Sequence, residues 1–365
     1  MINLRMPAEI SWEGPPLVTK IVSSSAETKG TTKYEQCPET GKITAHHENG
    51  IFSFTPPQED SFEGDIILLD PAGNRVQRLF RANSRHNTLL VTERCDQLCV
   101  MCSQPPRRTN DRWRFPLYSE AISMAPKNAT FCLSGGEPTL YKDELFSLLE
   151  SVASSRPDIN FHILSNGQHL IESDIPRLKE IHSQISVLWG IPLYASDPEI
   201  HDDIVDKKGA FNTLMKNLYL LGGSKASIEL RTVVMALNAL ELEKLAIFLS
   251  THLDFINYWA IMAMEPAGFA KANLKRLLYD HSLAPQPVHK ALDIAASRNL
   301  EARLFNFPLC TIGENYRKYC AQSISDWKRK YLEQCEECRE KNACTGFFEW
   351  YDRKSAWERI VPISI

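Results

Sequence analysis

The chain has 365 residues, of which 43% are hydrophobic and 24% charged, and its formal net charge is −4. This composition is ordinary for a globular protein of two or three domains, and it lacks the basic excess of sequence-independent nucleic-acid binders. Apolar runs fall short of the roughly 18 residues that a membrane span needs, and residues 1–14 lack the apolar core of an export signal. We therefore expect a cytoplasmic protein that binds neither membranes nor nucleic acid.

Residues 1–86 read as short strands broken by turns. Strands are predicted at Ile51–Thr55 and Asp65–Leu69, and Pro71-Ala72-Gly73 is a turn signal. We interpret this segment as a small β-rich N-terminal domain. We also hypothesise that it recognises a peptide, which would add to its sheet as a further strand.

Residues 87–300 have a different pattern, in which strands and helices alternate. Helical stretches such as Lys142–Ser154, Phe211–Leu221 and Ala239–Leu249 separate six predicted strands. The strands are expected at Thr88–Thr92, Thr130–Ser134, Asn160–Ser165, Ile185–Ile191, Ser227–Val234 and Phe255–Ile261. Repeated strand–helix units predict an α/β fold with a parallel sheet, here a partial (β/α)6 barrel of the TIM type. Active sites of such barrels lie at the C-terminal ends of the strands.

Ten cysteines carry most of the chemical information, and eight of them fall in two groups. The first group, Cys95, Cys99 and Cys102, forms a C-x3-C-x2-C pattern directly after the first predicted strand. Three thiolates on one short loop can bind three irons of a cubane iron–sulfur cluster and leave the fourth iron open to a ligand. A zinc site that lacks one ligand is the alternative. Of the isolated cysteines, Cys132 lies in an apolar run and is expected to be a buried core thiol.

A second motif, Gly135-Gly136-Glu137, ends the next predicted strand. Two glycines let the backbone approach a ligand closely, and Glu137 can accept a charge-assisted hydrogen bond from an ammonium group. A plain Gly-Gly turn with a solvated glutamate is the alternative. Because the motif comes one strand–helix unit after the cysteines, both are expected on the same rim of the barrel.

Together the two motifs resemble the radical S-adenosylmethionine (SAM) superfamily. The resemblance implies that Cys95, Cys99 and Cys102 hold a [4Fe–4S] cluster whose open iron binds the amino and carboxylate groups of SAM. It also implies that the Gly-Gly-Glu strand end contacts the methionyl amine, and that one electron cleaves SAM to methionine and a 5′-deoxyadenosyl radical. This radical then removes a hydrogen atom from the substrate. Met101 stands where the family often has an aromatic residue, and its thioether can pack against adenine.

Three further positions complete the predicted cofactor site. Ser165-Asn166 ends the third strand and resembles the position that contacts the ribose, with a plain turn as the alternative. Arg231 lies in the fifth strand, where an arginine facing the barrel interior needs an anionic partner such as a carboxylate of SAM or of the substrate. An outward-facing surface arginine is the alternative. The expected cofactor-binding residues are thus Met101, Gly135, Gly136, Glu137, Ser165, Asn166 and Arg231.

The second cysteine group lies in residues 301–365, which we expect to form a C-terminal domain. Its C-x2-C-x5-C pattern resembles the SPASM/twitch extension, which carries auxiliary [4Fe–4S] clusters, and a zinc site is the alternative. Five thiols cannot fill two cubanes, so one auxiliary cluster is expected. Its predicted ligands are Cys335, Cys338, Cys344 and Cys310, with Cys320 as the alternative to Cys310.

Within the superfamily the chain is most similar to the radical SAM maturases of the His-Xaa-Ser peptide-modification system. Four segments carry this similarity: Arg85-His86-Asn87, Cys102–Pro106, Ser323–Trp327, which also reads as a capped helix start, and Cys344–Phe348. The similarity implies a ribosomally made peptide as substrate, a second radical SAM protein that works alongside, and a reductase or other electron donor. A radical SAM enzyme for a small metabolite and a non-catalytic zinc-binding protein are the rival hypotheses.

Overall fold

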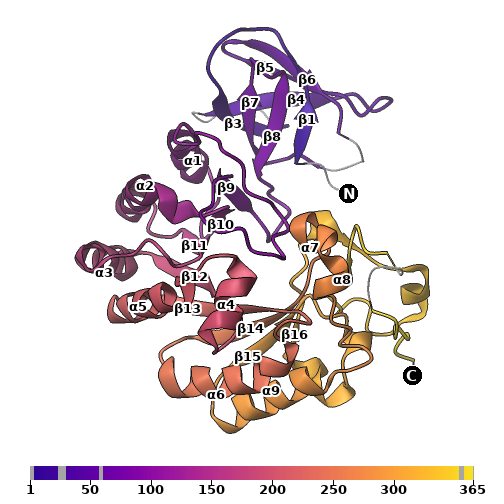
Figure 1. Cartoon of the computed structure of the whole chain (residues 1–365). Helices are drawn as coiled ribbons and strands as arrows, with labels where there is room; N and C mark the ends of the chain where they lie inside the picture. Colours follow the sequence, from indigo (N-terminus) through magenta and orange to yellow (C-terminus); the bar gives the residue numbers. More distant parts are fainter. Residues whose placement is uncertain (1–3, 24–29, 57–60, 353–356, 365) are drawn as a thin grey trace.

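The computed structural model describes residues 4–23, 30–56, 61–352 and 357–364. Two large sheets organise these residues, and Figure 1 shows them as an indigo-to-purple N-terminal sheet and a larger sheet beneath it. The first sheet ends at Phe80 and the second begins at Thr88. The domain boundary predicted between residues 86 and 87 lies in the short connection between the two sheets.

The N-terminal sheet has eight strands in the order β1-β8-β7-β3-β4-β5-β6-β2, paired antiparallel except for β3 with β4. Its strands are β1 (Arg5–Pro7), β2 (Glu9–Ile10), β3 (Leu17–Val22), β4 (Thr31–Gln36), β5 (Ile43–His47), β6 (Gly50–Phe54), β7 (Ile66–Asp70) and β8 (Arg75–Phe80). Because β1 and β2 follow each other in the chain but form opposite edges, the sheet curls until its edges approach (Figure 1). Ile21, Ile43 and Phe52 are fully buried inside the curl and form a core separate from that of the larger sheet.

The larger sheet confirms the predicted α/β fold. It has eight parallel strands in the order β16-β15-β14-β13-β12-β11-β10-β9, so that strands next to each other in the chain are neighbours in the sheet. Its strands are β9 (Thr88–Thr92), β10 (Thr130–Gly135), β11 (Asn160–Leu164), β12 (Ser186–Pro192), β13 (Ser227–Val234), β14 (Tyr258–Ala263), β15 (Ala302–Phe305) and β16 (Cys320–Ala321). The last two strands extend this sheet into the predicted C-terminal domain. They were not predicted, because strands of four and two residues are too short to show an alternating pattern.

Helices follow most of these strands. The α-helices of the described residues are α1 (Arg114–Ser123), α2 (Lys142–Ser155), α3 (Ile175–Gln184), α4 (Pro198–Val205), α5 (Ala210–Gly223), α6 (Leu242–His252), α7 (Gly268–Ala272), α8 (Leu274–Leu277) and α9 (Gln286–Ser297). Of these, α1, α2, α3, α5, α6 and α9 cover the outer side of the sheet, whereas α4, α7 and α8 lie on its other side (Figure 1). At the start of α4, Asp197 accepts hydrogen bonds from the backbone N–H groups of Glu199 and Ile200 at 2.8 and 3.1 Å, a regular N-cap. None of the helices within the described residues has the length and apolar character of a membrane span.

Alternation along the strands decides which side chains face the helices and which face the inside of the curved sheet. Phe131, Ile163 and Trp189 are almost completely buried and pack in the main core. Cys132 and His162, which have the opposite orientation and are register partners, are only partly buried. Cys132 therefore differs from the expected core thiol: it lies on the inner face, because its strand turns every second side chain away from the helices.

The C-terminal segment consists mainly of 3₁₀ turns and short strands. The turns are η4 (Leu309–Thr311), η5 (Glu314–Tyr319), η6 (Asp326–Lys328) and η7 (Glu333–Glu337), and β17 (Arg329–Lys330) pairs with β18 (Phe347–Phe348). Of the capped helix start predicted at Ser323–Trp327, only the short 3₁₀ helix η6 forms, and no side chain caps it. The Asp326 carboxylate instead binds the guanidinium group of Arg81 at 2.8 and 2.9 Å.

Candidate active site and auxiliary cysteine site

The first cysteine loop leaves the C-terminal end of β9. Its backbone turns tightly, with a hydrogen bond of 2.9 Å from Cys102 N to Cys99 O. Burial, together with negative charge on Cys102 and Cys95, raises the pKa of the Cys99 thiol to about 12. The three thiols are therefore close enough to interact electrostatically, as a shared ligand set requires.

The two glycines of the second motif pack against this loop. Gly136 N donates a hydrogen bond to Thr92 O at 2.8 Å, and Glu137 N donates one to Arg94 O at 2.7 Å. A Cβ atom at Gly136 would lie 2.1 Å from Arg94 O and 3.0 Å from Cys95 Cβ, so no other residue fits. The cysteine loop and the glycine motif thus lie side by side at the C-terminal ends of β9 and β10, on the same rim as expected.

The carboxylate of Glu137 joins β10 to the end of β11. It is fully buried, and it accepts hydrogen bonds from the backbone N–H and hydroxyl of Thr139, from Ser165 Oγ at 2.8 Å and from Asn166 N. Burial raises its pKa, and these donors partly oppose that effect. Both carboxylate oxygens are engaged, so Glu137 holds the predicted Ser165-Asn166 position against the glycine motif.

Asp96, inside the cysteine loop, was not expected to take part. Its carboxylate accepts a hydrogen bond from Asn166 Nδ2 at 2.8 Å, lies 3.2 Å from His169 Nε2 and forms an ion pair with Lys207. Although burial alone would raise the pKa of Asp96, these partners hold it well below its usual range. They tie the cysteine loop to the end of β11 and to the turn between α4 and α5. The polar residue between two cysteines was its only sequence signal.

Apolar side chains form one wall beside the cysteines. Met101 packs in a buried cluster with Tyr194 and Met264, which follow β12 and β14. Burial raises the pKa of the Tyr194 hydroxyl well above 10.0, and the Cys99 and Cys102 thiols raise it further, which places this tyrosine within electrostatic reach of the loop. Tyr194 was not predicted, because it lies beyond the end of its strand and only the folded sheet brings it beside the cysteine loop.

Arg231 belongs to a charged cluster on the inner face of the sheet. Its Nη1 lies 2.6 Å from the fully buried carboxylate of Glu229, which also binds His162 Nε2 and Tyr258 Oη, both at 2.8 Å. Burial alone would raise the pKa of Glu229, but Arg231 and the two other donors hold it at about 2. The anionic partner that an inward arginine needs is therefore Glu229, from the same strand. Gly190 makes room, since a Cβ atom there would lie 2.8 Å from His162 Nε2.

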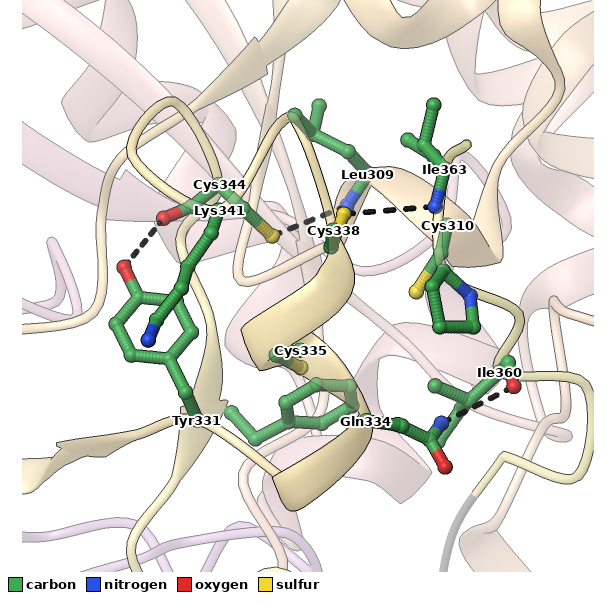
Figure 2. Close-up of a pocket in the computed structure, with 12 residues that line it drawn as sticks. Leu309, Cys310, Tyr331, Gln334, Cys335, Cys338, Lys341, Cys344, Ile360 and Ile363 are labelled. Atoms are coloured by element: carbon green, nitrogen blue, oxygen red, sulfur yellow. Dashed lines mark hydrogen bonds between the residues drawn. The ribbon is translucent and has the colours of Figure 1, made fainter. Parts of the chain in front are cut away.

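Four cysteines of the second group line a single pocket. Figure 2 shows them on three segments: Cys310, the Cys335–Cys338 turn and Cys344. Cys344 Sγ accepts hydrogen bonds from the backbone N–H groups of Leu309 and Gly346, and Cys338 Sγ accepts one from Ile363, all at 3.4 Å. The lining of this pocket does not include Cys320, which lies in β16 beside β15.

The chemistry of both donor sets fits iron–sulfur clusters. Each set consists of cysteine sulfurs, and backbone N–H groups directed at the sulfurs of the second set are a recognised feature of such sites. Among the described residues, no group of three or more His, Cys, Asp or Glu side chains is arranged to hold a single metal ion.

Part of the chain is similar to known proteins. Residues 89–249 match the family model described as Radical SAM superfamily. A cysteine-type anaerobic sulfatase-maturating enzyme of Clostridium novyi (strain NT) is 26% identical over 223 residues, and the match covers 57% of each chain. The chain thus spans little more than half the length of this curated relative.

Solved structures show weaker likenesses. One described as native anSMEcpe with bound AdoMet and Cp18Cys peptide is 20% identical, with a TM-score of 0.45 over 59% of this chain and 62% of that chain. A radical SAM methyltransferase from Sphaerobacter thermophilus is 12% identical, with a TM-score of 0.44 over 75% and 76%. The family match spans the cysteine loop, the Gly-Gly-Glu strand end and the strands and helices that hold them, and in residues 89–249 the chain is therefore similar to the radical SAM superfamily.

Proposed function

We propose that the protein is a radical SAM enzyme that cleaves SAM reductively and removes a hydrogen atom from a ribosomally made peptide. One observation carries the proposal. The glycine-rich end of β10 lies directly against the cysteine loop, with Gly136 N hydrogen-bonded to Thr92 O at 2.8 Å and no room for a side chain at Gly136. A backbone edge beside three thiols provides a place for a small polar ligand next to an open iron.

The proposed roles at this site follow from the contacts. Cys95, Cys99 and Cys102 would hold a [4Fe–4S] cluster with one iron open, and when bound it supplies the electron that splits SAM into methionine and a 5′-deoxyadenosyl radical. Met101 offers apolar, polarisable surface to adenine, and Tyr194 extends that wall.

The remaining side chains position the cofactor site. Glu137 fixes the turn at Ser165-Asn166, where we propose the ribose binds. Arg231 is proposed to hold a carboxylate of SAM or of the substrate, with Glu229 orienting its guanidinium group. In both proposals a fully buried carboxylate, Glu137 or Glu229, positions the group that would contact the ligand.

The second cysteine pocket is proposed to hold one auxiliary [4Fe–4S] cluster. Cys310, Cys335, Cys338 and Cys344 supply four sulfurs, which is a complete protein ligand set for a cubane. A complete set leaves no iron for a substrate, and we therefore propose electron transfer as its role. Cys310 is favoured over Cys320 because it lines the same pocket as the other three.

A peptide is the proposed substrate for two reasons. The curated relative is named for maturing a sulfatase, which is itself a protein. The segments that resemble the His-Xaa-Ser maturases point to a repeat-containing peptide and to a second radical SAM protein as partner. Mass spectrometry of a neighbouring peptide co-expressed with the enzyme tests this point, and a change of mass that needs intact Cys99 would support it. Turnover of a small metabolite without any peptide would contradict it.

The activity itself has a direct test. The full chain, purified and reconstituted without oxygen, should carry about eight irons and release 5′-deoxyadenosine from SAM when dithionite is added. A colourless protein that binds zinc at both cysteine groups, or one that never forms 5′-deoxyadenosine, would overturn the proposal.

A further inference from the structure

A second, larger cavity lies behind the auxiliary cysteines. Its volume is about 500 Å³, and its walls come from η4 and η5, the loop before α9 and the C-terminal residues 359–364. It shares three lining residues with the cysteine pocket: Cys310, Pro362 and Ile363. One side of Cys310 therefore faces the proposed cluster site while the other side borders this cavity.

The cavity is positively charged. Arg317, Arg339 and Arg359 line it together with Glu314, and outside the lining Glu340 lies 3.2 Å from Arg339, so three positive charges face two carboxylates. The local excess has the opposite sign to the chain as a whole, whose formal net charge is −4. A concave basic surface on an otherwise acidic protein concentrates field lines and attracts negatively charged partners.

Two of the three arginines lie on or against the segments that carry the proposed cluster ligands. Arg317 Nε donates a hydrogen bond to Leu309 O at 3.2 Å, immediately before Cys310. Arg339 directly follows Cys338, and its side chain is half exposed, with Glu340 at 3.2 Å. Arg359 is fixed through its backbone N–H, which donates to Ser282 Oγ at 3.0 Å. Any partner that engages these guanidinium groups lies close to the sulfur ligands.

We infer that this cavity and its three arginines form the docking site of an acidic one-electron carrier protein, which reduces the auxiliary cluster through the Cys310 side. The inference rests on the proposed function. The carrier loses one electron and the cluster gains one, while no covalent bond forms or breaks. The shared wall at Cys310 favours a redox partner over an acidic peptide, because a peptide substrate has no need to approach a fully ligated cluster.

The test uses flavodoxin as the acidic carrier and the cluster-loaded full chain. The variant Arg339→Gln/Arg359→Gln leaves Arg317, which supports Leu309, in place. The control Lys216→Gln/Lys244→Gln removes the same charge from exposed side chains on α5 and α6. We expect the arginine variant to bind flavodoxin about three- to tenfold more weakly at low salt, and to show a correspondingly slower flavodoxin-driven formation of 5′-deoxyadenosine. The control should behave as the wild type does.

Dithionite separates docking from chemistry, because it needs no protein interface. The arginine variant should match the wild type in thermal unfolding, in iron content and in the dithionite-driven rate. Equal flavodoxin affinity in variant and wild type would overturn the inference, as would wild-type affinity that is independent of salt. If the arginine variant loses only the binding of inorganic phosphate and keeps its affinity for flavodoxin, the inference is also overturned, because the cavity is then a site for small anions. If dithionite yields no 5′-deoxyadenosine with the wild type, the proposed function fails, while the affinity measurement still decides on docking.

Discussion

The two cysteine sites are built in different ways. The first places three thiols on one loop of eight residues, Cys95–Cys102, at the end of a parallel strand. The second collects four thiols from three segments spread over residues 310–344, two of which are the 3₁₀ segments η4 and η7. Strand ends of the large sheet support the first site, whereas the second site depends on contacts between segments far apart in the chain.

This difference matches the roles that we propose for them. A three-sulfur loop leaves one iron open, and the neighbouring glycine strand end supplies a backbone edge beside it. A four-sulfur pocket gives every iron of a cubane a protein ligand, so no iron is open to substrate. The proposed role of this pocket therefore depends on its position next to a basic cavity. The comparison predicts that damage to the first site abolishes chemistry, while damage to the second removes iron and slows electron supply.

The largest effect is expected from Cys99→Ala. Loss of one of only three protein ligands should release the first cluster, so that iron falls by about four per chain and 5′-deoxyadenosine drops below detection. Iron analysis and liquid chromatography of dithionite reactions measure both. The comparison would break if this variant still cleaved SAM.

Cys310→Ala compared with Cys320→Ala gives the next largest effect. The first change removes a sulfur that lines the four-cysteine pocket, and the second alters a residue of β16 outside that lining. We expect Cys310→Ala to lose about four irons while dithionite-driven SAM cleavage persists, and Cys320→Ala to keep all of its iron. The reverse result would assign Cys320 as the ligand.

Glu137→Gln tests how the strand ends support the first site. The carboxylate accepts hydrogen bonds from Thr139, Ser165 and Asn166 on its two oxygens. The amide of glutamine has only one oxygen that accepts, and its NH₂ group would face a donor. The free energy of unfolding should fall by about 2–3 kcal/mol. Urea denaturation measures the change, with Glu150→Gln on α2, whose partner Arg177 is at the surface, as a control of near-zero effect. An unchanged stability would show that the carboxylate is not the link between β10 and β11.

The contrast between local and distant support also explains what the sequence could predict. Strands β9 and β13 have the predicted bounds, because alternating apolar residues between turn signals are a local pattern. Strand β14 begins at Tyr258, three residues later than predicted. The misleading residue is Phe255, an apolar side chain that packs against Gly222 in a loop rather than in the sheet.

Among site residues the same rule holds. The three clustered cysteines and the two glycines could be singled out, since their spacing alone suggests a shared ligand. Asp96, Tyr194 and Glu229 could not, because their partners come from other strands and only the folded sheet brings them together. Glu229 had one usable signal: it stands two residues before Arg231 in a strand, so both side chains share a face.

Asp326→Asn probes the distant support of the second site and should have the smallest effect. Asp326 holds Arg81, which is 6% exposed, and Ser84, both from the connection between the two sheets. Beside it, Ser323 N and Ile324 N donate to Thr345 Oγ1, next to Cys344. Three of the segments that resemble His-Xaa-Ser maturases thus lie in or next to one joint, which gives their resemblance a structural reason.

Loss of this ion pair should lower the free energy of unfolding by about 1–2 kcal/mol, since Asp326 is itself about one-third exposed and water compensates part of the loss. Asp158→Asn is the matched control, because it breaks a similar bidentate pair with Arg156 within the larger parallel sheet and its helices. Chelator kinetics distinguish the two variants. Asp326→Asn should speed iron loss from the second site only, whereas Asp158→Asn should leave both sites as stable as in the wild type. Equal iron loss in the two variants would mean that global stability, and not the joint, keeps the auxiliary site together.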